Sequence, residues 1–210
     1  MASRIKVFAG PNDYDARRLY QEEAGELLVG VDSGLDRMLA ADLPIDIAVG
    51  DFDSIDPAHV GLVKARAGLV LTLPAEKNVT DLAYALDYLY NHVAYDSIVV
   101  YGGIGGRVDH LVANINLMKK YDLSFEDDNH RMFTLRKGTH AIGNPKRYVS
   151  FFAIEDCYDL SIKGFRYELD HHFLGTDDSL CVSNEGSGVV AFSKGRLLVI
   201  ETDDPAPRRP

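Results

Sequence analysis

Residues 97–120, SIVVYGGIGGRVDHLVANINLMKK, carry the pattern that decides the fold class. The segment opens with a short apolar run, Ser97–Tyr101, which predicts a buried strand. A glycine-rich turn follows, and Leu111, Ile115 and Met118 then recur at helical spacing. A strand that leads through a short loop into a helix is the repeating unit of α/β folds, in which helices cover both faces of a mostly parallel sheet.

The same alternation runs through the first half of the chain, where apolar runs of strand length alternate with amphipathic patterns. The expected strands are Ile5–Ala9, Glu26–Val31, Ile45–Val49, Leu69–Leu73 and Ser97–Tyr101. The expected helices are Ala16–Ala24, Pro57–Arg66, a helix with a stripe of Leu82, Leu86, Leu89 and Val93, and Val108–Lys120.

Beyond Asp122 the helical pattern ends, and short β-rich runs separated by Gly, Asn or Asp predict an antiparallel sandwich or barrel. These runs are Met132–Leu135, Arg147–Ile154, Tyr158–Ile162, Leu180–Ser183, Gly188–Phe192 and Arg196–Thr202. The polar stretch 126–130 is unsuited to a core and marks the boundary. We therefore expect an α/β domain at 1–128, an all-β domain at 129–203 and a disordered tail at 204–210.

The composition excludes several classes of protein. Of the 210 residues, 46% are hydrophobic and 26% charged, as in a globular protein with a substantial core. Thirty-two acidic residues against 22 Lys and Arg give a net charge of −10, which argues against nucleic-acid binding. No apolar run approaches the roughly 20 residues that span a bilayer, and the first residues lack a signal-peptide pattern. With only two cysteines, Cys157 and Cys181, we expect buried reduced thiols in a cytoplasmic protein.

Four polar clusters follow expected strands of the first half. In an open parallel sheet ligands bind outside the carboxyl ends of the strands, so the clusters are expected to meet at one edge. They are Asp32-Ser33-Gly34, Gly50-Asp51-Phe52-Asp53-Ser54, Glu76-Lys77-Asn78-Val79-Thr80-Asp81 and the run from Gly102 to His110.

Asp51 and Asp53 are candidates for a metal site. In an extended segment residues i and i+2 point to the same side, so both carboxylates could face one cation. Mg²⁺ commonly uses one or two carboxylates together with substrate phosphates. Alone, the pair fits equally well an acidic turn in which Asp53 or Ser54 caps the next helix. Asp32, Asp81 and Asp109 at the same edge favour the metal.

Two further clusters have structural alternatives. Asn78 and Asp81 have the spacing of a capping box, so Asp81 could be structural, and Lys77 could be either a phosphate contact or a surface lysine. The run from Gly102 to Arg107 holds four glycines, whose backbone can approach a phosphate that Arg107 then binds. A turn with a helix cap is the weaker alternative there. Asp13 and Asp36 fit none of these patterns.

In order along the chain, these motifs resemble those of the thiamine pyrophosphokinases (thiamine diphosphokinases). The resemblance also includes Gly164-Phe165-x-Tyr167 and Val182-Ser183-Asn184-Glu185 in the second half. The chain departs from the family pattern at Asn78, where Asp is common, and it contains no Trp.

The resemblance implies an enzyme that transfers the pyrophosphoryl group of ATP to the hydroxyl of thiamine and releases AMP. It implies that 1–128 is the catalytic, nucleotide-binding domain and that 129–203 is a β-sandwich thiamine-binding domain. It also implies a homodimer whose thiamine site lies at the subunit interface, with Mg²⁺ held by Asp32, Asp51 and Asp53. The implied catalytic residues are Asp51, Asp53, Asp81 and Asp109. ATP and its phosphates would contact Ser33, Gly34, Ser54, Lys77, Thr80, Gly105, Gly106, Arg107 and His110. Thiamine would contact Asp81, Tyr167, Ser183 and Asn184.

Two other functions remain open from the residues alone. Asp51-Phe52-Asp53-Ser54-Ile55 after an apolar run is similar to the nucleophile motif of haloacid-dehalogenase phosphatases, although Ile55 stands where Thr or Val is expected. A non-catalytic sensor of Mg²⁺-bound nucleotide is the third possibility.

Overall fold

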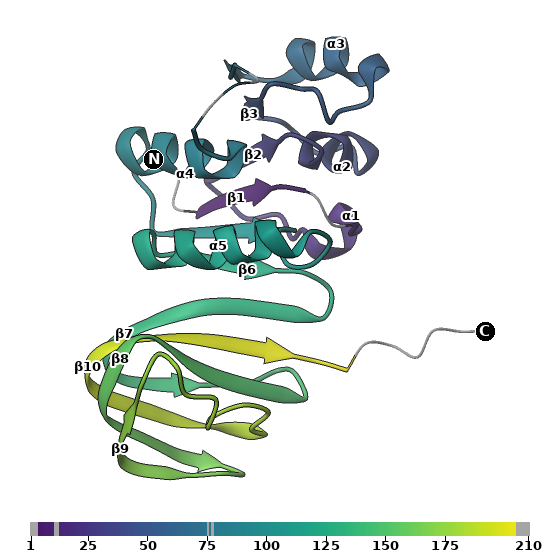
Figure 1. Cartoon of the computed structure of the whole chain (residues 1–210). Helices are drawn as coiled ribbons and strands as arrows, with labels where there is room; N and C mark the ends of the chain where they lie inside the picture. Colours follow the sequence, from purple (N-terminus) through teal and green to yellow (C-terminus); the bar gives the residue numbers. More distant parts are fainter. Residues whose placement is uncertain (1–3, 11–12, 75, 77, 205–210) are drawn as a thin grey trace. The chain divides into compact units, whose positions relative to one another are not determined.

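The computed structural model describes residues 4–10, 13–74, 76 and 78–204. The predicted phosphate contact Lys77 and residues 205–210 of the expected tail lie outside these ranges. Asp204 is described and forms an ion pair with Arg147. The chain divides into two compact units, residues 1–128 and 129–210, and each is described by itself (Figure 1).

The N-terminal unit contains a parallel sheet, as expected from the sequence. Its strand order is β4-β3-β2-β1-β5-β6, and Val7 of β1 lies between Val29 of β2 and Val100 of β5. The strands are β1 (Arg4–Phe8), β2 (Glu26–Val31), β3 (Ile47–Gly50), β4 (Leu69–Thr72), β5 (Ser97–Tyr101) and β6 (Ser124–Glu126). The three-residue β6 was not expected, because a run so short carries no clear pattern.

Helices connect these strands (Figure 1). They are α1 (Ala16–Leu19), α2 (Gly34–Ala40), α3 (Pro57–Arg66), α4 (Asp81–His92) and α5 (Val108–Lys120). The predicted helix 16–24 is wrong in its end, because Tyr20 is extended and the carbonyl of Gln21 accepts a hydrogen bond from Lys6. The stripe of Leu82, Leu86 and Leu89 is buried in α4, as predicted.

The central strands of this sheet are buried on both faces, and helices cover each face. On one face Phe8, Leu28 and Ala48 pack with Leu35 and Met38 of α2 in one buried cluster. The odd-numbered residues of β1 and β2 point to the other face, and α4 contacts β2 and β3. With both faces covered, the carboxyl ends of the strands are the open edge of the sheet.

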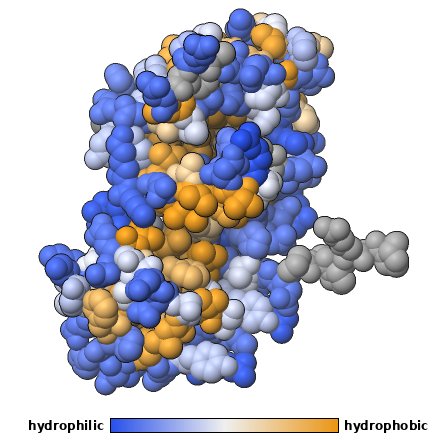
Figure 2. Space-filling view, viewed as in Figure 1, coloured by the Kyte–Doolittle hydropathy of each residue, from blue (hydrophilic) through white to orange (hydrophobic). Residues whose placement is uncertain are grey.

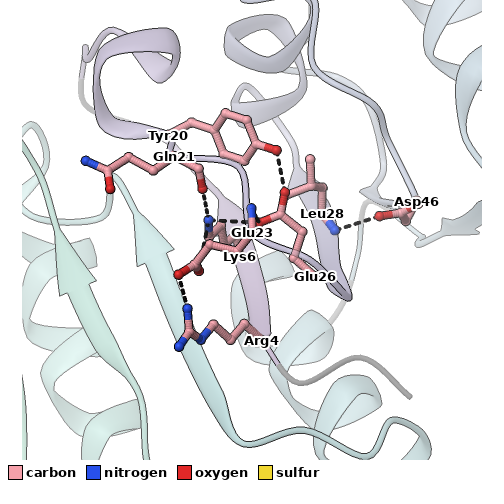
Figure 3. A network of polar contacts seen from close by, with 8 residues as sticks. All are labelled: Arg4, Lys6, Tyr20, Gln21, Glu23, Glu26, Leu28 and Asp46. Carbon is pink, nitrogen blue, oxygen red and sulfur yellow. Dashed lines mark hydrogen bonds and ion pairs between the residues drawn. The ribbon is translucent and has the colours of Figure 1, made fainter.

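A buried ion-pair network anchors β1 (Figure 3). Lys6 is 3% exposed, and its Nζ lies 2.8 Å from Oε2 of Glu26 and 3.2 Å from Oε2 of Glu23. The face of the Tyr20 ring lies against the same ammonium, with its centroid 4.9 Å from Nζ, and its hydroxyl donates to Glu26. A buried ammonium is tolerated only when it is paired in this way.

The C-terminal unit is an antiparallel sheet with strand order β7-β10-β8-β9. The strands are β7 (His130–Ile142), β8 (Tyr148–Phe165), β9 (Leu169–Leu174) and β10 (Gly186–Thr202). They are long and curved (Figure 1), and side chains from all four, such as Leu135, Phe151, Leu174 and Val190, form one core.

The all-β prediction is confirmed, but its strand boundaries need correction. The runs expected separately at 147–154 and 158–162 form one strand, and so do 188–192 and 196–202. Each strand contains a β-bulge or similar irregularity, after which the pairing resumes in a shifted register. The strand expected at Leu180–Ser183 is wrong: the segment forms a turn, and Ser183 has φ +58°. Asn184 forms an isolated bridge with Val149, and the carbonyl of Cys181 accepts from the N–H of Phe151 over 2.9 Å.

Two remaining expectations concern cysteines and membranes. Cys157 and Cys181 are both buried free thiols, as predicted. None of the helices in the described ranges is long and apolar enough to cross a membrane.

Candidate active site

A cavity of about 370 Å³ opens in the N-terminal unit where the strands end. Its lining comes from the segments after β1, β2 and β3 and from the starts of α4 and α5. The lining residues are Ala9, Gly10, Val31, Asp32, Ser33, Ser54, Val79, Thr80, Asp81, Leu82, Arg107, His110 and Asn114. The chain leaves β1 toward β2 on one side and returns at β5 on the other, so β1 and β5 flank the topological switch point, where such sheets bind ligands.

The structure brings together part of the predicted site. The predicted residues that line the cavity are Asp32, Ser33, Ser54, Thr80, Asp81, Arg107 and His110. Others lie in the same loops but are not among the lining residues: Gly34, Asp51, Asp53, Gly105, Gly106 and Asp109. Gly34 is buried, and its Cα packs so tightly on β1 that an added Cβ would lie 2.1 Å from the carbonyl oxygen of Phe8. Its place in the fold is therefore explained by packing.

Asp32 links the ends of β2 and β3. Its backbone N–H donates to the carbonyl of Val49 over 3.1 Å, and its carboxylate lies against Gly50. A Cβ at position 50 would lie 2.2 Å from Oδ1 of Asp32. Glycine at position 50 thus leaves the room that the Asp32 carboxylate occupies beside Asp51.

The loop after β3 is not extended, which corrects the reasoning that placed Asp51 and Asp53 on one side. Phe52 has φ +64° and is buried, and the backbone N–H of Asp53 donates to Oδ1 of Asp51 over 3.2 Å. Asp53 and Ser54 are exposed. The expected cap at Asp53 or Ser54 is also wrong, because Asp56 caps α3 by accepting from the N–H of Ala58.

The residues at this edge suit Mg²⁺ only in combination with substrate oxygens. Asp32 and Asp51 offer carboxylate oxygens on neighbouring strand ends, the donor type that Mg²⁺ prefers. Within the described ranges, no group of three or more His, Cys, Asp or Glu side chains is arranged to hold a metal ion. The donor set therefore fits an ion that completes its shell with phosphate oxygens and water.

The start of α4 shows which residue caps the helix. Thr80 is the N-cap, and its Oγ1 accepts a hydrogen bond from the N–H of Ala83 over 3.2 Å. The proposed capping box of Asn78 and Asp81 is wrong, since Asp81 is the first helical residue rather than the third. Asp81 lines the cavity. The capping-box role considered for the Asp81 carboxylate is therefore excluded.

The glycine loop leads into α5 with a charged pair at its start. Gly105 and Gly106 have φ of +98° and +68°, which other residues rarely adopt. Arg107 donates to Asp109 through both Nε (3.2 Å) and Nη2 (2.6 Å). This fork lowers the pKa of Asp109 and raises the pKa of Arg107, so both groups are charged at neutral pH.

Sequence reasoning missed six lining residues of this cavity, which are Ala9, Gly10, Val31, Val79, Leu82 and Asn114. Ala9 and Gly10 follow β1, and a Cβ on Gly10 would meet Oγ of Ser33 at 2.0 Å. Asn114 is 5% exposed, and its Nδ2 donates to the carbonyl of Gly103 over 2.9 Å. The sequence did offer a signal for Asn114, because this polar residue interrupts the apolar stripe of α5. The hydrogen bond of Asn114 fixes the glycine loop onto the helix.

The C-terminal unit has its own cavity of about 250 Å³, which includes two predicted thiamine contacts. It is lined by Ile162, Tyr167, Glu168, Leu169, Leu180, Cys181, Val182 and Asn184. Tyr167 is 58% exposed, whereas Asn184 is 3% exposed. The Asn184 side chain accepts from the N–H of Tyr167 (2.9 Å) and donates to its carbonyl (2.7 Å), so it positions Tyr167. Ser183 is exposed beside the lining.

Two features define the character of this second cavity. Burial raises the pKa of the Cys181 thiol to about 11, so it is a neutral thiol at pH 7 rather than a nucleophile. Two of the cavity's lining side chains are exposed, Leu180 (56%) and Val182 (44%). Figure 2 shows apolar patches on one face of the molecule. An aromatic and aliphatic wall suits a small organic ring system.

Comparison with known proteins connects the two units to one family. Residues 19–130 match the family model described as the thiamin pyrophosphokinase catalytic domain, and residues 135–197 match the thiamin pyrophosphokinase vitamin B1 binding domain. The chain belongs to the thiamine pyrophosphokinase family. The resemblance to this family that the sequence motifs indicated is thereby confirmed.

Individual members of the thiamine pyrophosphokinase family are similar over most of the chain. The thiamine pyrophosphokinase of Bacillus subtilis is 34% identical over 190 residues, which cover 85% of this chain and 88% of that protein. A crystal structure of the Bacillus subtilis enzyme covers 97% of this chain and all of its own, with 31% identity and a TM-score of 0.86. The structure from Geobacillus thermodenitrificans covers 97% and 99% of the two chains, with 31% identity and a TM-score of 0.83.

Proposed function

We propose that the chain transfers the pyrophosphoryl group of ATP to the hydroxyl of thiamine, giving thiamine diphosphate and AMP. The observation that carries this proposal is the cavity at the switch point, which gathers Asp32, Asp81 and Arg107 in a chain whose two halves match the two domains of the family. The same match supports this reaction over a haloacid-dehalogenase-like phosphatase and over a non-catalytic nucleotide sensor.

The cavity would hold the phosphate chain of ATP. Transfer of a phosphoryl-type group depends on positioning and charge neutralisation more than on covalent catalysis. Arg107 can bind a phosphate through the same two nitrogens that now contact Asp109. Polar groups along the wall come from Ser33, Ser54, Thr80 and His110. Lys77, Gly34, Gly105 and Gly106 complete the proposed phosphate-binding set.

Asp32 and Asp51, with Asp53, would hold Mg²⁺ against the phosphates. When bound, the ion neutralises charge on the transferred group and keeps the β-phosphorus open to attack in line with the departing AMP. The carboxylates supply the oxygen ligands that this ion selects.

A carboxylate near the phosphates would activate the hydroxyl of thiamine. Asp81 lines the cavity at the start of α4, and Asp109 lies beside Arg107 at the start of α5. One of them would accept the proton of the thiamine hydroxyl as its oxygen attacks phosphorus. While Arg107 is paired with it, the pKa of Asp109 is lowered and Asp109 is a weaker base, so transfer of Arg107 to a phosphate would make Asp109 more basic.

The thiamine ring is proposed to lie against Tyr167, beside Ser183 and the Asn184 that positions Tyr167. We propose a homodimer in which the thiamine site is completed at the subunit interface, as the family resemblance implies. Apolar surface on the C-terminal unit supports such an association (Figure 2). A monomer in sedimentation at micromolar concentration would contradict the shared site. We also propose that the protein acts in the cytoplasm, where the two free thiols, Cys157 and Cys181, would stay reduced.

A product assay tests the proposed reaction. The protein is incubated with Mg²⁺, ATP and thiamine, and AMP, ADP, phosphate and thiamine diphosphate are resolved. Equal amounts of AMP and thiamine diphosphate are expected. Phosphate without AMP, with a trapped phospho-Asp51, would support the phosphatase. ATP binding without turnover would support the sensor.

A further inference from the structure

Asp36, which no motif explained, joins two loops of the active-site cavity. It lies in the first turn of α2, directly after the cavity-lining Asp32 and Ser33. Its Oδ2 accepts a hydrogen bond from the backbone N–H of Asp56 over 3.2 Å, and its Oδ1 lies 2.8 Å from Nδ1 of His59. One carboxylate therefore binds both the last loop residue and the first turn of α3.

The loop that Asp36 holds is the one that carries the proposed metal and phosphate contacts. Between β3 and α3 the loop is anchored in the core by Phe52 (8% exposed) and Ile55 (3% exposed). Asp53 and Ser54, which lie between these anchors, are exposed. Its far end is Asp56, so the Asp36 bond limits how the whole loop can shift.

We propose that Asp36 is a positioning residue that holds the loop 51–56 in register with the turn 32–34, so that both meet the same Mg²⁺-bound triphosphate. The inference rests on the proposed function. A carboxylate suits this role because its two oxygens accept from two donors at once, whereas an amide offers one acceptor oxygen. His59 of α3 provides the second of these contacts, with its Nδ1 2.8 Å from Oδ1 of Asp36.

The same two helices provide a matched control. At the other end of α2, Asp42 accepts from Nη2 of Arg66 in α3 over 3.0 Å, and the pair is away from the cavity lining. Asp42 has φ +54°, a conformation that Asn tolerates, so Asp42→Asn is a mild change. Asp36→Asn thus removes one charge that links α2 to α3, and Asp42→Asn removes one that links the turn after α2 to α3.

The test measures three quantities in the full chain: affinity for ATP with Mg²⁺ by calorimetry, the KM values for ATP and thiamine, and hydrogen exchange of the Asp56 amide by NMR. Asp36→Asn is expected to weaken ATP affinity about tenfold, the low end of what loss of an outer-shell partner costs. It should raise KM for ATP, leave KM for thiamine unchanged and speed exchange at Asp56. Asp42→Asn should change none of these.

Wild-type ATP affinity and Asp56 exchange in Asp36→Asn would overturn the inference. Equal losses in both variants would also overturn it, because they would mark a general helix contact. If the wild-type protein binds ATP but forms no thiamine diphosphate, the proposed function fails, while the affinity and exchange measurements still decide the role of Asp36. Asp36→Ala, which removes both bonds, serves as a second variant. Its loss of ATP affinity and its increase in Asp56 exchange should be larger than those of Asp36→Asn.

Discussion

The carboxylate of Asp32 lies in the space that a side chain at Gly50 would need. A Cβ at position 50 would sit 2.2 Å from Oδ1 of Asp32, and the backbone there has φ +149°. Gly50→Ala should therefore displace the Asp32 carboxylate and weaken Mg²⁺-dependent ATP binding about tenfold. Gly61→Ala in α3 is the control, since nothing lies within 4 Å of its added Cβ. That variant should keep its affinity and gain up to about 1 kcal/mol of stability. Unchanged ATP binding in Gly50→Ala would refute the placement of Asp32.

In the proposed function, Arg107 exchanges its contact with Asp109 for a phosphate. Both side chains are well exposed, so the pair itself contributes little to stability. Arg107→Gln should raise KM for ATP about tenfold, equivalent to roughly 1.4 kcal/mol of lost binding, with the unfolding midpoint unchanged. Arg66→Gln, which removes another exposed ion pair, should leave KM unchanged. Steady-state kinetics over ATP concentration decides between them.

Lys6 and Arg4 both bind Glu23 from the same strand, but they differ in burial. The Lys6 side chain is 4% exposed and that of Arg4 is 53% exposed. Lys6→Met leaves the largely buried Glu26 without its counter-charge and should lower the free energy of unfolding by about 3–5 kcal/mol. Arg4→Gln should cost less than about 1 kcal/mol. Urea unfolding of both variants measures the difference, and equal costs would show that the network in Figure 3 adds nothing.

Tyr167 is expected to contact thiamine through its ring rather than its hydroxyl. Tyr167→Phe should keep KM for thiamine within about twofold, whereas Tyr167→Ala should raise it about tenfold, a typical value of roughly 1.4 kcal/mol for a lost aromatic contact. KM for ATP should not change in either variant. If Tyr167→Ala retains the wild-type KM for thiamine, the C-terminal cavity is not the thiamine site.

His59 makes stability depend on pH in a defined direction. The hydrogen bond to Asp36 raises the pKa of His59, with further attraction from Asp56. A raised folded-state pKa adds stability that is complete below the unfolded value of about 6.5 and is lost as pH rises through the folded pKa. The urea midpoint should therefore fall between about pH 6 and pH 8 less in His59→Gln than in the wild type.

His171 provides the comparison for this pH effect. It pairs with Asp159, which also raises its pKa, so it contributes with the same sign from the C-terminal unit. His171→Gln removes this contribution and leaves that of His59. A pH profile that is identical in His59→Gln and the wild type would contradict the assignment to Asp36 and His59.

The local hydrophobic pattern of the sequence was sufficient to predict most of the secondary structure. The apolar run 97–101 and the stripe of Leu82, Leu86 and Leu89 predicted elements that the structure contains, because burial of one face dictates the periodicity. Failures occurred where long-range contacts overrode local preference. The helix expected to reach Ala24 ends at Leu19, where Lys6 captures the carbonyl of Gln21.

The sequence by itself determined the fold class, the family motifs and the edge of the sheet where they meet, since these follow from hydrophobic periodicity and from the order of strands and loops. Only the tertiary structure decided which carboxylates face the cavity. The left-handed Phe52 turns Asp53 away from the geometry expected of an extended segment, and the partner of Asp36 lies 20 residues along the chain. Backbone torsions in turns and contacts between distant residues leave no periodic trace, so their consequences for individual side chains emerge only when the chain is folded.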